Sequence, residues 1–112
     1  MAVPLPLNES NKSVERRNAD QRYTAKIIAE VRQLDSGLMP VWLLNFSISG
    51  ASFHCEEKLR NESPIFMQIY NHKLIRADLV WHKWDHYGCK FSEPLREDTR
   101  DSILVRAAKS QF

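Results

Sequence analysis

Residues 23–32 read Tyr-Thr-Ala-Lys-Ile-Ile-Ala-Glu-Val-Arg, in which apolar side chains fall at every second position from Ala25 to Val31. Successive side chains of a β-strand point to opposite faces, so this period of two is typical of a strand that buries one face. The stretch therefore predicts a first strand whose inward side chains include Ile27 and Val31.

Five further segments of the same kind follow, and turn residues such as Asp35-Ser36-Gly37 or Asn71-His72 separate them. These segments span residues 40–46, 51–56, 65–70, 75–81 and 87–91. Short strands without a long helical period predict an antiparallel barrel or sandwich, and a closed six-stranded barrel over about residues 22–92 leaves no unpaired edge. The predicted core comprises Ile27, Val31, Phe53, Leu79, Trp81, Cys89 and Phe91.

Both ends of the chain differ from this body. Residues 1–14 mix polar residues and prolines without apolar periodicity, which predicts a flexible N-terminal arm before a single domain at 15–112. After Pro94, the spacing of Ile103, Leu104, Ala107 and Ala108 predicts an amphipathic helix over about residues 98–108. Asp98 or Thr99 is the expected cap of that helix.

The composition limits the class of protein. A chain of 112 residues holds one hydrophobic core, and no apolar run approaches the roughly 18 residues of a membrane span. The N-terminus is too short and too broken by prolines for a signal peptide, so we expect a cytoplasmic protein without membrane insertion. Its two cysteines, Cys55 and Cys89, are expected to be reduced and buried. The net charge of +2 disfavours general DNA or RNA binding.

Catalytic signatures are missing from the sequence, which has no nucleophile elbow, no P-loop and no His-Glu-Xaa-Xaa-His pair. Zinc accepts side chains such as His82, His86, Cys55 and Cys89. However, both cysteines share strand parity with core residues, and we expect the two histidines on the outer face of a hairpin. The sequence therefore predicts neither an enzyme nor a metal or cofactor site.

Two polar clusters remain that the fold alone does not require. The first comprises Arg16, Arg17 and Arg22, whose guanidinium groups can pair with a phosphate or stack on a base, although a solvated charge run explains them too. The second is the segment Asn45-Phe46-Ser47-Ile48-Ser49-Gly50 at a strand end, which is either an ordinary turn or a place where a ligand approaches the backbone.

Taken in this order, the two clusters resemble the PilZ domain family of bacterial cyclic di-GMP receptors. Asn45, Ser47 and Gly50 match the second motif of that family residue for residue. Tyr87-Gly88-Cys89-Lys90-Phe91, followed by Pro94-Leu95, is similar to its last strand and the entry to its closing helix. The resemblance covers about residues 15–108 and implies a PilZ-like six-stranded barrel with a short C-terminal helix.

The resemblance also implies a ligand site. Arg16, Arg17 and Arg22 would grip the phosphates and stack on guanine, Asn45 and Ser47 would hydrogen-bond the guanine edge or nearby backbone, and Gly50 would keep the turn open. One feature departs from the family pattern, which places two arginines four positions apart. Here Arg17 and Arg22 are five apart, and Gln21 holds the expected place.

Three functions stay open at this point. The first is a receptor that binds cyclic di-GMP, orders residues 15–22 and so changes its contact with a downstream protein. The second, favoured by the arginine spacing, is a PilZ-like adaptor without useful affinity for this ligand, which acts through protein contacts in pilus, flagellar or secretion systems. The third is a barrel that stacks single-stranded nucleic acid on Trp42, Trp81 and Trp84, against which the near-neutral charge and the expected inward direction of Trp81 both count.

Overall fold

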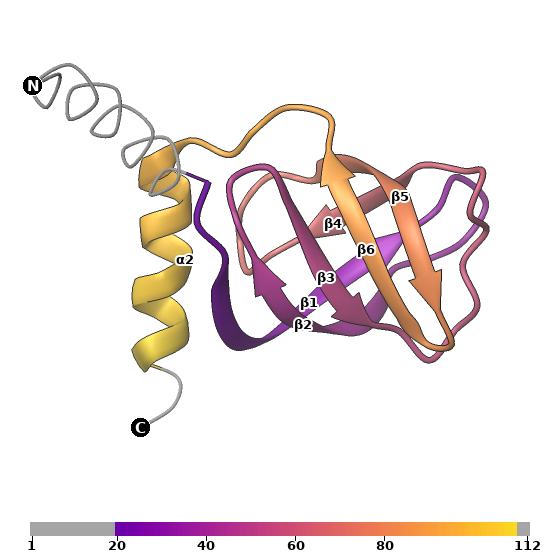
Figure 1. Ribbon diagram of the computed structural model, residues 1–112, viewed down its shortest axis with the longest axis horizontal. Coiled ribbons are helices and arrows are strands. Elements are labelled where there is room, and N and C mark those ends of the chain that lie inside the picture. The colour runs from indigo at the N-terminus through magenta and orange to yellow at the C-terminus, as the bar shows by residue number, and fades with distance from the viewer. Residues whose placement is uncertain (1–19, 110–112) are drawn as a thin grey trace, which may run out of the picture.

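The computed structural model describes residues 20–109 and shows a closed barrel of six antiparallel strands, followed by one helix (Figure 1). The predicted fold class is thus confirmed. The strands are β1 (Tyr23–Arg32), β2 (Met39–Phe46), β3 (Gly50–His54), β4 (Ile65–Gln68), β5 (Ile75–Lys83) and β6 (His86–Phe91), and the helix is α2 (Glu97–Lys109). The predicted N-terminal arm at 1–14 lies outside the described residues.

The barrel closes in the order β1-β2-β3-β6-β5-β4, because β1 pairs with β2 on one side and with β4 on the other. Its two ends are different. At one end, which we call the turn end, the turn Ser47–Ser49 joins β2 to β3, and α2 stands beside it (Figure 1). At the opposite end, which we call the hairpin end, Trp84 and Asp85 join β5 to β6.

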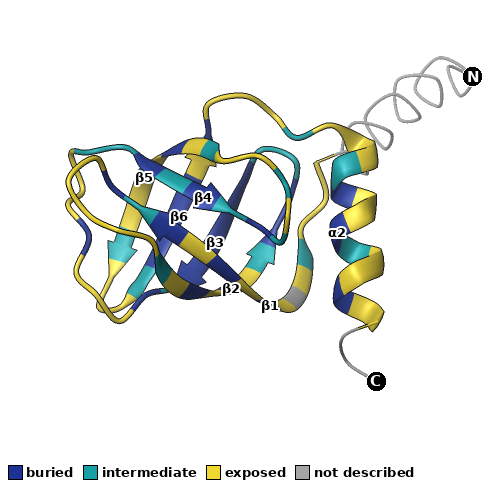
Figure 2. Ribbon diagram, turned by 180° about the vertical axis from the view of Figure 1, so that it is seen from behind, coloured by how far each residue is buried: buried dark blue, intermediate teal, exposed yellow. Residues whose placement is uncertain are grey.

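Inward side chains of all six strands fill the barrel, as the dark segments along each strand show in Figure 2. Ile27, Val31, Phe53, Cys89 and Phe91 are buried as predicted, and Leu79 is half-buried against the same core. Both cysteines are free and buried. Helix α2 covers the turn end with Ile103 and Ala107, which are buried on its barrel side.

The prediction that Trp81 lies in the core is wrong. The pairing of β5 with β6 shifts between Leu79 and Trp81, so a bulge turns Trp81 outward and leaves it 48% exposed. A bulge inserts one residue and thereby reverses the parity of everything beyond it. For the same reason His82 turns inward, against our expectation of the outer face, and its ring stacks on the buried Tyr87 at 4.2 Å between centroids.

Helix α2 begins at Glu97, one residue before the predicted start, so Asp98 and Thr99 lie in its first turn and do not precede it as caps. The acidic Glu97 and Asp98 there face the positive end of the helix dipole. Within residues 20–109, no helix is both long enough and apolar enough to span a membrane.

Candidate functional site

The turn end brings together the two polar clusters singled out in the sequence. Antiparallel pairing of β1 with β2 sets Thr24 opposite Asn45 and Tyr23 opposite Phe46. The residues just before β1 therefore lie beside the last residues of β2, although they are far apart along the chain. This register explains how an arginine segment and an Asn-Xaa-Ser-Xaa-Xaa-Gly segment can form one site.

A bulge in β2 directs Asn45 away from the core. Strict alternation from Val41 and Leu43 would point Asn45 inward and Phe46 outward. Instead, the pairing with β3 shifts between Leu43 and Asn45, so Phe46 is buried and Asn45 is half-exposed. Bulges are frequent beside functional sites because they redirect a side chain in this way.

Arg22 reaches this asparagine directly. Its Nη1 donates a hydrogen bond to Oδ1 of Asn45 at 3.0 Å, and both side chains are accessible to solvent. A guanidinium group carries five donors, so the remaining ones stay available for an anion or for the edge of a base. Arg22 and Asn45 thus form a polar pair on the outer surface of the barrel.

Asp20 and Ser49 form a second contact between the same two segments. The hydroxyl of Ser49 donates to Oδ1 of Asp20 at 2.6 Å, and it lies 3.1 Å from the hydroxyl of Ser47. Sequence reasoning missed both Asp20 and Ser49. Ser49 could have been predicted from its place inside the motif segment. Asp20 lies four residues before the β1 residue that pairs with Asn45, and its residue type alone does not indicate a site.

Ser47 is a structural residue of the turn as the structure places it. It is 1% exposed, and its hydroxyl accepts a hydrogen bond from the backbone N–H of Ser49 at 3.2 Å. Its own backbone N–H donates to the carbonyl of Gly50 at 2.8 Å. A hydroxyl used in this way fixes the loop on which Asn45 and Ser49 are presented.

Gly50 is required by the close approach of two strands. It pairs with Lys90 of β6, and an ideal Cβ on Gly50 would overlap the carbonyl oxygen of Cys89. The turn is also tied to the end of β6 and the connector beyond it, because Phe91 N–H donates to the carbonyl of Ser49 at 2.8 Å and Leu95 N–H to that of Ile48 at 2.7 Å. The turn is therefore a rigid platform joined to the connector of α2.

The positive charge of Arg22 acts on the buried core beneath the turn. Burial raises the pKa of the Cys89 thiol to about 12, while a backbone hydrogen bond from Ala51 and the charge of Arg22 oppose this rise. A thiol with so high a pKa is protonated at neutral pH and is no nucleophile. The structure therefore gives Cys89 no reactive role in this site.

Arg16 and Arg17, the other two arginines of the predicted site, lie outside the described residues. Of the six predicted site residues, the structure brings together Arg22, Asn45, Ser47 and Gly50. Among residues 20–109, no group of three histidine, cysteine or acidic side chains is arranged to hold a metal ion. The available chemistry consists of guanidinium, amide and hydroxyl groups, together with one carboxylate from Asp20.

Comparisons with known proteins agree with this architecture. The family model of the PilZ domain matches residues 15–107, so the chain belongs to the PilZ domain family, a family of cyclic di-GMP receptor domains rather than of enzymes. Among solved structures, the PilZ domain of CeSA from a cellulose synthesizing bacterium is similar, with a TM-score of 0.53 and 15% identity over 82% of this chain and 99% of that one. At this identity the likeness shows the fold alone. A search of curated proteins finds no significant match.

Proposed function

We propose that this chain is a bacterial receptor for cyclic di-GMP that acts in the cytoplasm and passes its signal to a downstream protein. The observation that carries the proposal is the hydrogen bond between Arg22 and Asn45, which joins the arginine segment to the second PilZ motif. Cyclic di-GMP is a dianion with two guanine bases. Guanidinium groups suit such a ligand because they pair with phosphates and stack on purines.

The residues of the turn end take different roles in this proposal. Arg22, with Arg16 and Arg17, binds the phosphates and the faces of the bases, while the side-chain amide of Asn45 hydrogen-bonds a guanine edge. Ser47 supports the ligand indirectly, because its buried hydroxyl holds the turn. Gly50 serves the packing of β3 against β6 in the same indirect way.

Ligand binding at this site is an exchange of partners. Oδ1 of Asn45 already accepts from Arg22, and Ser49 already donates to Asp20. The ligand must displace or share these contacts, and the carboxylate of Asp20 repels its phosphates. Part of the contact energy is therefore used in the exchange, so we expect moderate affinity that falls with salt.

The signal leaves the protein through residues 15–22 in this proposal. Three arginines repel one another when no anion is present, and a dianion removes that repulsion. Asp20 and Arg22 already contact Ser49 and Asn45, so binding fixes the rest of the segment beside them and creates a composite surface that a partner protein can recognise. Such a switch is driven by the preference of the ligand for one position of the segment.

Calorimetric titration with cyclic di-GMP, with GTP and cyclic GMP as controls, tests the receptor function. We expect selective binding that weakens roughly tenfold in Arg17→Ala and in Arg22→Ala, since a charged hydrogen bond contributes about 1.5 to 3 kcal/mol. Arg76→Ala is the matched control, because Arg76 is exposed on β5 and lies outside the motif segments. Unchanged affinity in both site variants would mean that the arginine segment is a solvated charge run.

Hydrogen exchange tests the switch separately from the affinity. Residues 15–22 should exchange more slowly with cyclic di-GMP than without it, while the barrel stays unchanged. Equal exchange of this segment in both states, despite measured binding, would show that the signal takes another route.

A second candidate function is an adaptor that kept the fold without useful affinity for the nucleotide. Two observations favour it, namely the spacing of five between Arg17 and Arg22 and the carboxylate of Asp20 on the motif serine Ser49. Under this function, calorimetry gives no heat with cyclic di-GMP, and the protein acts only through its surfaces. The same titration therefore distinguishes the two functions.

A further inference from the structure

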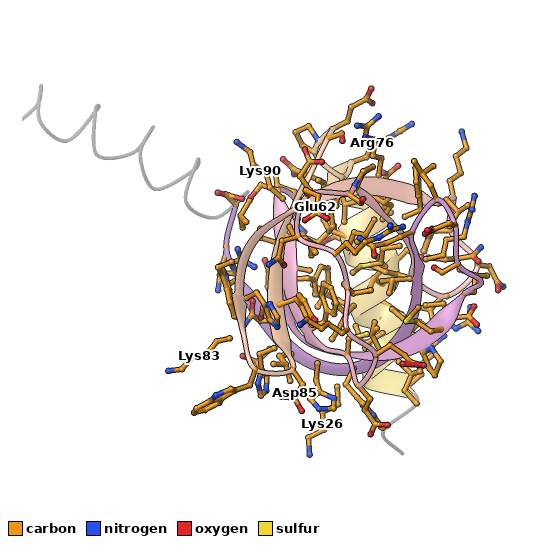
Figure 3. All side chains as sticks on the ribbon, turned by 90° about the vertical axis from the view of Figure 1, so that its right-hand side faces the viewer. Lys26, Glu62, Arg76, Lys83, Asp85 and Lys90 are labelled. Atoms are coloured by element: carbon orange, nitrogen blue, oxygen red, sulfur yellow. The ribbon has the colours of Figure 1, made fainter. Side chains whose placement is uncertain are left out.

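The hairpin end carries a surface that the proposed receptor function does not use. We call it the hairpin-end surface and define it by two hollows that share Glu56 and Glu57. Trp42 borders the first hollow, together with Met39, Pro40 and His54, and Trp84 borders the second, together with Lys58 and Asp85. Figure 3 faces this end of the barrel and shows Lys83 and Asp85 on the same part of its rim.

Trp84 is held outward at a cost to the backbone. It is 82% exposed and adopts a φ of 55°, although it stands in a two-residue hairpin turn where glycine fits without strain. A bulky residue with positive φ is a genuine outlier, and such strain is concentrated at functional sites. An exposed indole contributes little to the core, so the fold alone does not account for a tryptophan at this position.

The hairpin beneath Trp84 is fixed in place. Nε2 of His54 donates to Asp85 at 2.7 Å, and Nδ1 of His86 lies 3.3 Å from the other carboxylate oxygen of the same residue. The backbone carbonyl of Asp85 also accepts from Cys55 N–H at 2.9 Å. The indole is therefore presented from an ordered support, which lowers the entropy lost when a partner binds.

The first hollow is acidic and aromatic at once. Trp42 is 50% exposed, and no lysine or arginine lines this hollow. Glu56 and Glu57 are exposed, and neither forms an ion pair with any other residue of the stretch 20–109. A carboxylate beside an aromatic face is the arrangement that binds a guanidinium or ammonium group.

The second hollow has a different character. Lys58 lines it, and Nζ of Lys83 lies 5.4 Å from the ring centroid of Trp84, so these two cations offset the acidic groups there. This hollow suits an apolar side chain against the exposed indole. The two hollows together match a short segment that carries one basic and one apolar residue.

We propose that the hairpin-end surface binds a basic segment of a partner protein, with an arginine or lysine seated between Trp42 and Glu56–Glu57 and an apolar side chain packed on Trp84. Nucleic acid fits poorly, because Glu56, Glu57 and Asp85 repel phosphates beside the same tryptophans. The surface lies at the end of the barrel opposite α2 and the turn (Figure 1). It does not depend on whether the turn end binds cyclic di-GMP.

Selection of a random 12-residue peptide library on the immobilised full chain tests this proposal. We expect the enriched peptides to carry basic and apolar residues, and to bind at least tenfold more weakly to Trp42→Ala and to the double variant Glu56→Gln/Glu57→Gln. The matched controls are Trp81→Ala, since Trp81 is similarly exposed on the barrel wall, and Glu62→Gln. The controls should retain binding.

Trp84→Gly distinguishes loss of the binding surface from loss of folding. Glycine accepts the positive φ, so the thermal midpoint should stay the same or rise while peptide binding falls severalfold. Enrichment of acidic peptides, no enrichment at all, or binding that ignores Trp42 and Trp84 would overturn the proposal. Tighter binding of single-stranded oligothymidylate than of the basic peptides would overturn it in favour of nucleic acid. Calorimetry with cyclic di-GMP on the same variants is expected to be unchanged, so failure here leaves the receptor proposal intact.

Discussion

The two ends of the barrel offer opposite kinds of surface. At the turn end, exposed polar groups are already engaged with one another, because Arg22 donates to Asn45 and Ser49 donates to Asp20. At the hairpin end, Trp84 stands in solvent, and Glu56 and Glu57 have no ion-pair partner among the residues described. A ligand at the turn end must compete with the protein itself, whereas one at the hairpin end meets two carboxylates that no ion pair within residues 20–109 engages.

This difference predicts different energetics. Exchange of hydrogen bonds at the turn end makes binding weaker than the sum of the new contacts and lets small charge changes tune it. The hairpin end instead stores strain in the backbone of Trp84, so its binding and stability respond to mutation in opposite directions.

The two cysteines allow the ends to be compared by their thiol reactivity, since one cysteine lies near each end. Cys89 pairs with Ala51 near the turn end, and burial raises its thiol pKa from 9.0 to about 12. A rise of this size lowers the thiolate fraction roughly a thousandfold, so we expect native Cys89 to react about that much more slowly than a free thiol. Cys55, at the hairpin end, also has a pKa raised by burial, and we expect it to react first. Mass spectrometry after thiol labelling at pH 8 would contradict this if Cys89 were modified first.

The same thiol gives a pH dependence of stability. The folded pKa of Cys89 lies above its unfolded value, so its contribution is complete below about pH 9 and is lost as the pH rises toward 12. Cys89→Ala should be less stable than the parent chain at pH 7, and it should lose less stability than the parent chain between about pH 9 and pH 12. Urea unfolding across this range measures the effect, and parallel curves for both proteins would refute it.

Glycine substitutions test how rigid the platform of the turn end is. A Cβ on Gly50 would overlap the backbone oxygen of Cys89, so Gly50→Ala should lower the free energy of unfolding by about 2 to 3 kcal/mol. The three atoms nearest to a Cβ on Gly88 all belong to the indole of Trp81, a half-exposed side chain that can rotate, so Gly88→Ala should lower the free energy of unfolding by about 1 kcal/mol. Urea unfolding measures both, and equal losses would show that Trp81 cannot move.

A double-mutant cycle tests whether Arg22 and Asn45 act together on cyclic di-GMP. Arg22→Ala and Asn45→Ala should each weaken binding about tenfold, and the double variant should be little worse than either one, because each residue positions the other. Arg76→Ala and Asn61→Ala, at exposed positions outside the motif segments, are the controls. Fully additive losses, measured by calorimetry, would show that the hydrogen bond between the two residues has no role in binding.

Removal of the charge on Asp20 should have a smaller effect, of opposite sign. Asp20→Asn keeps an oxygen that can accept from Ser49 but no longer repels the phosphates of the ligand. We expect cyclic di-GMP to bind about two- to fivefold more tightly, and this gain to shrink as salt is added. Asp78→Asn on β5 is the control. Weaker binding would mean that Asp20 itself contacts the ligand.

Alternation of side chains in the sequence is enough to predict the six strands and most of the core. It fails where bulges intervene, and nothing in a single sequence marks a bulge. Strict alternation therefore predicts Trp81 inside the barrel, although the shift after Leu79 turns it outward. The same loss of parity hides the inward turn of His82 onto Tyr87. Both errors lie on β5, and because of the first the sequence does not predict the exposed indole of Trp81 on the outer wall of the barrel.

Residue types and their order predict the candidate site, but they do not predict its hydrogen bonds. The motif points to Asn45, Ser47 and Gly50, whereas the contact of Asp20 with Ser49 depends on where the chain enters β1. Likewise, nothing in the sequence indicates that Ser47 is buried and Asn45 exposed, since this depends on the bulge after Leu43. Long-range contacts of this kind depend on register, which local patterns leave open.

The smallest effect concerns the carboxylate that supports Trp84. The hydrogen bond from His54 holds the pKa of Asp85 below its usual value of 3.8. Because the folded pKa is lower than the unfolded one, the stabilising contribution is present above about pH 4 and is lost as the pH falls through the folded value. Asp85→Asn should therefore have a slightly lower thermal midpoint than the parent chain at pH 7, and this difference should vanish near pH 2. Asp85 is half-exposed, so solvent screens the interaction and keeps the effect small. Asp78→Asn serves as the control for general charge effects. An equal difference at both pH values would show that the charge of Asp85 has no part in supporting the hairpin, and that the backbone hydrogen bond from Cys55 holds it alone.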